Sequence, residues 1–502
     1  MAARAPGAST GRGTSVDDVP LIIGGVGLLL VLLVGFSMSI DMVNLDVWTG
    51  LLTAAVLLVV SVPVFMWMGK QEGWPRMAAW LTLALVAKFV FSMVRYFVIF
   101  RVYKGEGDAG IYVEAAAELA KRIRLGLPLH PLDHRINSYP VASQYMGDIT
   151  GFIFYLTGAS KYATFMIYSW ICFIGQMLAC QALKIGVPEA RYRRYVLLVV
   201  FLPSLLFWPS SAGKEAVMVL CFGLCALGAA MLLGQRTNLW GFLPFLAGCW
   251  AAFMIRPHIA VMALAALAAA FGIGAVLGKG DGSEAESKQK TSSRALRIVG
   301  LVVMLAIFAG ASSQLGKLLG GEDTTGGSSK DSTADVLEKT AKQSSIGNSA
   351  FTPAMVSNPV EVPWGVTSVL FRPFPWEANG GSLIAAGESA LLAGLFVVSA
   401  GRLLTLWTLL RRRAYLVFTL AFAIEFAIAF SYIGNFGILA RQRVVMLPAV
   451  LVLLALPTRK ELAEYDGEHA QEELPARGRM PQRAGTLGLA GTHRQLETNP
   501  PR

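Results

Sequence analysis

The sequence predicts an all-α fold: a polytopic helical membrane protein with about 12 transmembrane helices. Hydrophobic residues make up 55% of the 502 residues and charged residues only 15%, whereas soluble domains carry about 25% charged residues. The mean hydropathy is +0.56. Apolar stretches close to the roughly 20 residues that a bilayer span needs recur along most of the chain. These observations exclude a disordered chain and a chain built of soluble domains.

The apolar stretches define the expected elements and the domain organisation. We expect a disordered cytoplasmic N-terminus over 1–19, a transmembrane domain over 20–457 and a disordered cytoplasmic tail over 458–502. The first stretch is long and lacks a small-residue cleavage site before Asp41, so it predicts a retained span. The candidate spans lie near 20–40, 48–68, 77–100, 161–184, 195–210, 214–234, 239–257, 258–278, 296–313, 383–410, 414–433 and 444–457.

Basic residues in the short loops predict the orientation in the cell membrane. If the N-terminus is cytoplasmic, every cytoplasmic loop is basic, including Arg411–Arg413, as expected for such loops. Residues 145–157 are moderately apolar and are interpreted as interfacial or re-entrant, because a crossing there would reverse every later loop. The outer face then holds two large loops, 101–160 and 314–382.

The net charge and the cysteines indicate which partners and metal sites to expect. The formal charge of +11 is explained by basic loops facing anionic lipid, so the lipid bilayer is expected as a partner and nucleic acid is not. Cys221 and Cys225 share a helical face, but no histidine or second cysteine pair stands at ligand spacing. We therefore expect no metal site and no cofactor; a divalent cation is compatible with the sequence but not indicated.

The first outer loop contains a prominent carboxylate. Asp108 follows two glycines just beyond a candidate span, and apolar residues recur at helical spacing from 109 to 124. This spacing predicts an amphipathic helix on the membrane surface. Asp108 is interpreted either as the N-terminal cap of that helix or as a general base at the membrane boundary, and the two roles are compatible.

Several cations and aromatic residues are expected on the same outer face. Each has a plain structural alternative: a lysine snorkelling at a span end, an interfacial arginine in a tight hairpin, or an aromatic belt. Lys and Arg also bind phosphate well, so together they predict a basic pocket for a polyprenyl-phosphate ligand. The residues are Lys214 and Glu215 after the broken stretch 201–213, Arg256 and His258 around Pro257, Arg372, Trp376 and Glu377 in FRPFPWE, and Arg441 and Arg443 in ARQRVVMLP.

Two further charges fall within predicted spans. Lys88 lies in the middle of the third candidate span and Glu425 in the middle of the eleventh. Ionisable residues at this depth are costly and are usually paired or functional. A structural Lys88–Glu425 pair, a proton or ion relay, and unrelated positions facing water all remain open.

The motif Gly107-Asp108-Ala109-x-x-Tyr112, together with FWPSSAGKE and RQRVVMLP, resembles stretches of the GT-C superfamily of membrane glycosyltransferases, in particular bacterial envelope members. The resemblance covers most of 77–457 with short, degenerate motifs. It implies a GT-C-like fold and transfer of a sugar from a polyprenyl-phosphate-linked donor to an envelope glycan, lipid or protein acceptor on the outer face.

By the same resemblance, Asp108 is the general base. Lys214, Arg256, Arg441 and Arg443 are donor-phosphate ligands, with His258 a weaker one. Tyr112, Glu215, Arg372, Trp376 and Glu377 are candidate substrate-binding residues.

The chain departs from the GT-C pattern at identifiable positions. Two candidate spans precede the one that leads into the Asp108 loop, where many members have one. Position 109 is alanine, where some branches have a second acidic residue. The alternatives are an O-antigen-type polysaccharide polymerase or ligase, which would rely on arginines and tolerate Asp108→Asn, and a lipid-linked glycan flippase or transporter, which would use Lys88 and Glu425.

Overall fold

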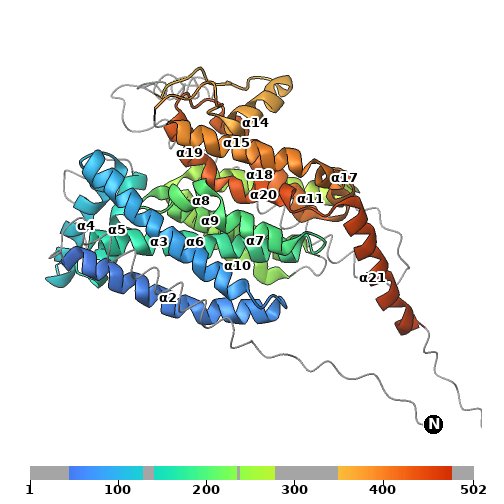
Figure 1. The fold of residues 1–502 in the computed structure, drawn as a ribbon, viewed down its shortest axis with the longest axis horizontal. Helices are drawn as coiled ribbons and strands as arrows, with labels where there is room; N and C mark the ends of the chain where they lie inside the picture. Colours follow the sequence, from blue (N-terminus) through green and yellow to red (C-terminus); the bar gives the residue numbers. More distant parts are fainter. Residues whose placement is uncertain (1–44, 128–140, 235–237, 278–348, 381, 478–502) are drawn as a thin grey trace, which may run out of the picture.

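The computed structural model describes residues 45–127, 141–234, 238–277, 349–380 and 382–477. Within these ranges the chain forms helices and one isolated antiparallel bridge, between Ala350 and Asn435. The prediction of an all-α fold is therefore confirmed for the described chain. Most of the long helices run along one common direction (Figure 1).

Several helices are long and apolar enough to cross a membrane. Among the described residues there are four such helices, α2, α3 with its extension, α6 and α9, or up to six spans if two bent pairs are each counted as one. The predicted spans 20–40 and 296–313 lie outside the described residues, so the total of twelve stays a prediction. The continuous helices are Leu45–Gln71 (α2), Met77–Val102, Lys161–Gly186 (α6) and Lys214–Leu233 (α9).

The remaining helices are shorter or bent. The pair Ser382–Val398 (α15) and Ala400–Arg412 bends by 59°, and the pair Phe436–Val445 and Leu447–Leu454 (α20) bends by 69°. The others are α7 (Tyr192–Phe201), α8 (Pro203–Phe207), α10 (Phe242–Ile255), α11 (Pro257–Leu277), α14 (Val362–Phe371), α16 (Ala400–Leu403), α17 (Leu406–Arg412), α18 (Ala414–Phe430) and α19 (Phe436–Gln442).

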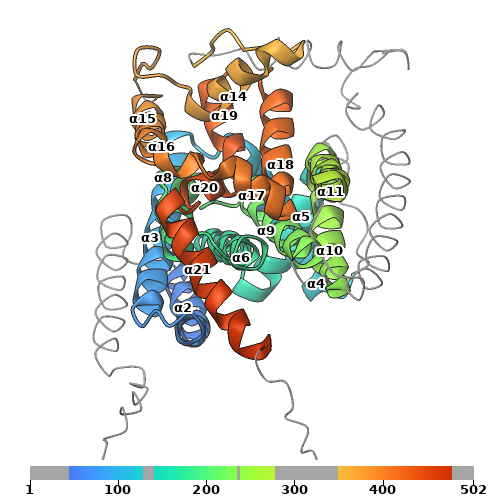
Figure 2. The ribbon, with the colours of Figure 1, turned by 90° about the vertical axis from the view of Figure 1, so that its right-hand side faces the viewer.

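Helices α6 and α9 form the centre of the bundle, and the other helices surround them (Figure 2). They approach closely because glycines face each other: a Cβ placed on Gly175 would lie 2.5 Å from the Cα of Leu220, and one on Gly223 would collide with the Gly175 carbonyl. Small residues at such contacts let helix backbones pack directly in membranes. This contact fixes the position of α9, whose first turn carries Lys214 and Glu215.

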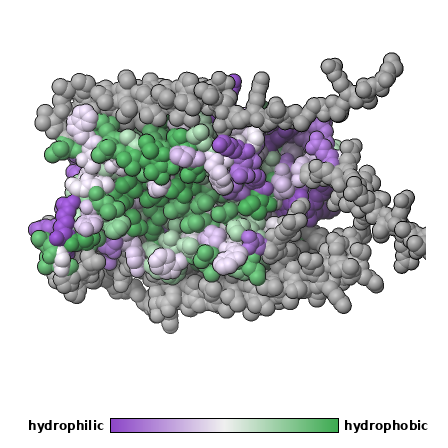
Figure 3. Space-filling model, turned by 90° about the horizontal axis from the view of Figure 1, so that it is seen from below, coloured by the Kyte–Doolittle hydropathy of each residue, from purple (hydrophilic) through white to green (hydrophobic). Residues whose placement is uncertain are grey.

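One face of the molecule is apolar and exposed. Helix α2 presents Leu52, Val56, Val59, Val60 and Trp67 outward, each more than half exposed. Seen from the α2 side, hydrophobic residues form a continuous surface, with hydrophilic residues gathered mainly toward one end (Figure 3). A bilayer is the environment in which such a surface is favourable.

The predicted span 195–210 is a broken helix. Helix α7 ends at Phe201, and Pro203 begins the short α8. The break is stabilised by side chains: Glu388 of α15 accepts hydrogen bonds from the backbone N–H and hydroxyl of Ser204, at 2.7 and 2.5 Å. Backbone groups freed inside a membrane protein need such partners.

Helix α3 (Met77–Phe97) continues into a π-helical turn, Val98–Val102, before the chain leaves the bundle. The following helices, α4 (Asp108–Arg124) and α5 (Val141–Thr157), pack against each other. The helix predicted at 109–124 is thus observed. Helix α5 covers the apolar face of α4, where Val113, Ala116 and Ala120 pack around Phe154. This face was predicted to contact the membrane surface.

The predicted disordered tail is helical at its start. Residues Arg459–Arg477 form α21. The backbone N–H of Thr458 donates to Glu461 at 2.8 Å, and the Glu461 N–H donates to the Thr458 hydroxyl at 3.3 Å. This is the reciprocal capping of a Thr-x-x-Glu sequence, a local signal for a helix start that corrects the predicted boundary at 458.

Candidate functional site

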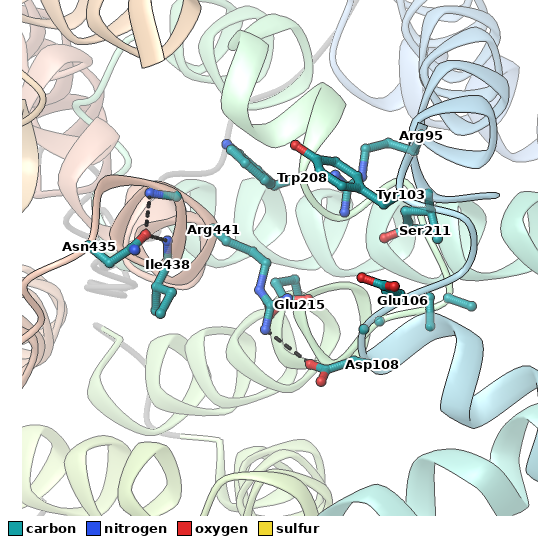
Figure 4. Close-up of a pocket in the computed structure, with 16 residues that line it drawn as sticks. Arg95, Tyr103, Glu106, Asp108, Trp208, Ser211, Glu215, Asn435, Ile438 and Arg441 are labelled. Carbon is teal, nitrogen blue, oxygen red and sulfur yellow. Dashed lines mark hydrogen bonds and ion pairs between the residues drawn. The ribbon is translucent and has the colours of Figure 1, made fainter. Parts of the chain in front are cut away.

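A cavity of about 490 Å³ lies at the end of the bundle where α3 leads into α4. The segment before α9 and helix α19 complete its walls (Figure 4). Its charged lining residues come from segments far apart in the sequence, and Figure 4 shows Arg441 extending from α19 toward Asp108 and Glu215. They are Arg95, Glu106, Asp108, Glu215 and Arg441.

Asp108, Arg441, Glu215 and Arg256 form a chain of ion pairs. An Nη of Arg441 donates to Asp108 at 3.1 Å, and its Nε lies 3.1 Å from Glu215. Arg256 donates to the same Glu215 oxygen at 2.8 Å. Arg256 and Glu215 are almost fully buried, whereas the side chain of Asp108 is 43% exposed. The exposed end of the chain therefore faces the cavity.

Asp108 is the first residue of α4, but its side chain does not cap the helix. The N-cap residue is Gly107, at φ 108°, where a residue with a side chain would be strained, and no side-chain cap hydrogen bond is formed there. The carboxylate is directed at Arg441 instead. The capping role is thus corrected, and the carboxylate is available for chemistry in the cavity.

Glu215 lies in the first turn of α9, where backbone N–H groups and the helix dipole favour a negative charge. Its carboxylate is held between two arginines, Arg256 on the buried side and Arg441 on the cavity side. Glu215 therefore positions Arg441, and Arg256 compensates the negative charge of Glu215. A buried carboxylate without such partners would be strongly unfavourable.

Arg95 is a cavity residue that the sequence analysis missed. Its guanidinium lies 5.0 Å from the ring centre of Phe207 and 5.2 Å from that of Trp208. In the described part of the chain no carboxylate lies within ion-pair distance of it, and its buried Nε has no hydrogen-bond partner. A cation held by aromatic rings and lining a cavity is well placed to bind an anionic ligand. The sequence carries only a weak signal for this residue, since an arginine near the end of an apolar span commonly snorkels to the interface.

Two of the predicted phosphate ligands are close to the cavity without lining it. Lys214 donates to the Ser143 hydroxyl at 3.3 Å, and its Nζ lies 6.0 Å from the ring centre of Tyr112. Arg256 is turned toward Glu215. The expected convergence of Asp108 with Lys214 and Arg256 in one pocket is therefore wrong, which counts against the predicted phosphate pocket. The cavity arginines are Arg95 and Arg441.

Arg443, also predicted to bind phosphate, is a structural residue. Its side chain is 1% exposed. It donates to the carbonyls of Leu370 and Arg372 at 3.1 and 2.9 Å and to the Ser389 hydroxyl at 3.0 Å. These bonds join the end of α14 to α15, so the guanidinium has no access to the cavity.

The other predicted substrate-binding residues also lie away from the cavity. Arg372 pairs with Glu377 at 3.0 Å and lies 4.7 Å from the ring centre of Phe351. Trp376 is 80% exposed and stacks on the Phe374 ring. His258 packs near the Phe430 ring, with centroids 5.7 Å apart. The aromatic segment FRPFPWE thus folds around its own arginine.

Tyr112 is buried in α4 behind Asp108 and does not line the cavity. Burial, reinforced by the negative charge of Asp108, raises the pKa of the Tyr112 hydroxyl well above its usual value. The phenol therefore stays neutral and supports the packing of α4, away from the cavity lining.

The two charges within the spans do not meet. Lys88 is fully buried and donates to the Leu205 carbonyl of α8 at 2.6 Å. One carboxylate oxygen of Glu425, on α18, is buried with no hydrogen-bond partner among the described residues. Lys88 thus satisfies a carbonyl at the broken helix, and no contact in the described chain supports a Lys88–Glu425 pair.

Comparisons with protein-family models, with curated proteins and with solved structures find no match for this chain. The site is therefore interpreted from its own residues. In the described chain, no three His, Cys, Asp or Glu side chains gather where they could hold a metal ion. The cavity contains a half-exposed carboxylate, Asp108, paired with Arg441, and a second arginine, Arg95, in the same lining. Glu106 and Glu215 also line it.

Proposed function

We propose that the protein is a membrane glycosyltransferase that transfers a sugar from a polyprenyl-phosphate donor to an envelope acceptor on the outer face of the cell membrane. The observation that carries this proposal is a cavity at the end of apolar helices, lined by Asp108, by its ion-pair partner Arg441 and by Arg95. Transfer from a phosphate-activated sugar needs a base for the incoming hydroxyl and cations for the leaving phosphate.

The residues divide the chemistry between them. Asp108 accepts the proton of the acceptor hydroxyl while the oxygen of that hydroxyl forms a bond to the anomeric carbon of the donor sugar. The bond from that carbon to the phosphate oxygen breaks, and the polyprenyl phosphate leaves with the electron pair. Arg95 and Arg441 bind the phosphate and stabilise its additional charge. Attack opposite the leaving group inverts the configuration of the sugar.

Arg441 connects the two parts of this reaction. Its guanidinium bridges Asp108 and Glu215. A donor phosphate that binds Arg441 competes with Asp108 for the same guanidinium and releases the carboxylate toward the acceptor. Glu215, fixed by Arg256, keeps Arg441 in place during this exchange.

Apolar surface for the lipid chain lies beside the proposed phosphate site. Ile99, Trp208 and Ile438 line the cavity together with the charged residues. Ile99, one helical turn after Arg95, shares its face of the helix. These apolar residues would contact the part of the lipid chain next to a phosphate at Arg95.

The two alternatives receive less support from the geometry. Arg372, the arginine of the second predicted outer loop, is engaged with Glu377 and aromatic rings, whereas a polymerase or ligase of the arginine type would need it available. A transporter relying on Lys88 and Glu425 would need them in one pathway. Lys88 bonds the Leu205 carbonyl instead.

The proposal is tested by sugar transfer in membranes supplied with a panel of labelled polyprenyl-phosphate sugars. Asp108→Asn keeps the shape of the side chain but removes the base, and we expect transfer to fall by about 100-fold or more. Glu114→Gln, on an exposed position of the same helix, is the matched control and should keep wild-type transfer. Undiminished transfer in Asp108→Asn at normal protein levels would overturn the proposal.

A further inference from the structure

A groove of about 1170 Å³ lies at the opposite end of the bundle from the cavity. We call it the α7 groove, because α7 forms one wall and α15 the other. Trp80 of α3 lines it, whereas Arg95 of the same helix lines the cavity. Fifteen residues of helix separate these positions, which corresponds to about 22 Å. The groove is therefore a separate site.

Most of the charge along the groove is already compensated. Glu461 pairs with Arg191 at 2.7 Å and with Arg402 at 2.8 Å, and Glu72 pairs with Lys184 at 2.6 Å. Burial raises the pKa of Glu461, but hydrogen bonds from Arg191, from the backbone of Thr458 and from Arg402 outweigh it and lower the pKa to about 2. These carboxylates are thus committed to their own partners.

Arg193 and Arg194 are the cations that remain. In the described chain neither has a carboxylate within ion-pair distance. Arg193 donates to the Gly73 carbonyl at 3.3 Å and lies over the Trp74 ring. Arg194 donates to the Ser399 hydroxyl at 2.6 Å, and its buried Nε has no hydrogen-bond partner among the described residues. Two arginines therefore border the groove, and neither is paired with a carboxylate of the described chain.

The walls below these arginines are apolar. Leu197, Leu198 and Phe201 of α7 form one wall, and Leu395 and Val398 of α15 form the other. Val398 is 82% exposed, so the groove opens at the surface of the bundle and does not enclose its contents. Paired cations above an apolar groove are complementary to an anionic head carrying hydrocarbon chains.

We propose that the α7 groove binds an anionic phospholipid, with its phosphate at Arg193 and Arg194 and its acyl chains between α7 and α15. A small polar anion would gain nothing from the apolar walls, and a zwitterionic lipid would leave the positive charge uncompensated. The Arg194–Ser399 hydrogen bond joins α7 to the end of α15, and the ion pairs of Glu461 join α21 to Arg191 and Arg402. The bound lipid would add contacts between α7 and α15 at the same place. The proposal does not depend on the glycosyltransferase activity.

The test is native mass spectrometry of the full-length protein in detergent, titrated with phosphatidylglycerol or with phosphatidylcholine of the same acyl chains. We expect phosphatidylglycerol to bind about 10- to 30-fold more tightly, because its head group has a net negative charge, whereas the choline ammonium of phosphatidylcholine offsets the same phosphate beside two arginines. The double variant Arg193→Gln/Arg194→Gln should lose this preference. The double variant Arg411→Gln/Arg412→Gln removes the same charge outside the groove and should keep it.

A second variant tests the groove without changing any charge. Val398→Trp places a large side chain at the exposed lip and should reduce bound phosphatidylglycerol several-fold, even if the arginine variant fails to fold. Equal affinity for the two lipids, equal losses in both double variants, or an unaffected Val398→Trp would each overturn the proposal. Displacement of the lipid by excess inorganic phosphate would also overturn it, by showing a simple anion site.

Discussion

At the scale of single residues, the arginines near the cavity are held in different ways. Arg95 lies against aromatic rings, Arg441 bridges two carboxylates, and Arg256 is buried against Glu215. Arg443, two positions after Arg441, bonds backbone carbonyls and Ser389. Arginine has several donors in a fixed plane, so the same residue type can serve a ligand or the fold, depending on what surrounds it.

Substitution of Arg443 should therefore reduce the stability of the fold and should not directly affect ligand binding in the cavity. We expect Arg443→Met to lower the free energy of unfolding by about 3 kcal/mol, since it leaves buried carbonyls without their donor and removes the positive charge 3.8 Å from Glu388. Thermal denaturation of the purified protein measures this. Arg411→Met, at an exposed position over Trp407, should leave the transition almost unchanged. Equal effects of the two substitutions would contradict the structural role.

The sequence allowed prediction of some of these residues and not of others. Asp108 was identified because a carboxylate after a span and beside glycines stands out locally. Arg441 and Arg443 have similar surroundings in the sequence, and only the packing of α14 and α15 separates a cavity residue from a buried one. Arg95 was missed because it lies within a predicted span, where its orientation toward a cavity depends on the neighbouring helices.

At the scale of elements, helices α6 and α9 pack backbone against backbone at Gly175 and Gly223. We expect Gly175→Ala to destabilise the protein by about 1–3 kcal/mol, because a methyl group there collides with the α9 backbone. Gly272→Ala on α11 is the control, since no atom lies within 4 Å of the added methyl. Folded yield and thermal denaturation of both variants test this, and a stable Gly175→Ala would contradict the assigned packing.

Element predictions succeeded where hydrophobicity decides the structure. The long spans α2, α3, α6 and α9 were all predicted within a few residues of their observed bounds. The prolines of 201–213 predicted a break in this stretch, and the break between α7 and α8 falls at Pro203. The hydrogen bonds from Ser204 to Glu388 were not predicted, because Glu388 lies on a helix distant in the sequence. The start of α21 was missed although Thr458 and Glu461 form a local capping sequence. The error arose because the charged and proline-rich composition of 458–502 was taken to predict disorder, and the capping sequence at its start was not considered.

At the scale of the whole molecule, the cavity and the α7 groove lie at opposite ends of the helices. The basic loops predict that the end carrying Asp108 is extracellular and the end carrying α21 is cytoplasmic. This orientation is a requirement of the proposed reaction, because the donor is expected at the outer face.

The orientation can be measured by cysteine labelling. All five native cysteines are buried, so the background is expected to be low. Glu106→Cys, exposed at the cavity end, should react with a membrane-impermeant thiol reagent in intact cells. Glu464→Cys, exposed on α21, should react only after permeabilisation. The opposite labelling pattern would show that the end carrying Asp108 is cytoplasmic, and it would contradict the proposal that the reaction takes place at the outer face.

The π-helical turn at the end of α3 has a consequence for insertions and deletions. Its i to i+5 bonds include that from the Tyr103 N–H to the Val98 carbonyl, at 3.0 Å, which means that the turn holds one more residue than an α-helical turn. Each residue of an α-helix advances the chain by about 100° around its axis. A sequence shorter by one residue here would restore regular helix and rotate the segment leading to Asp108 by about that angle. The alignment of Asp108 with Arg441 is thus set by chain length within this turn as well as by the identity of the two residues.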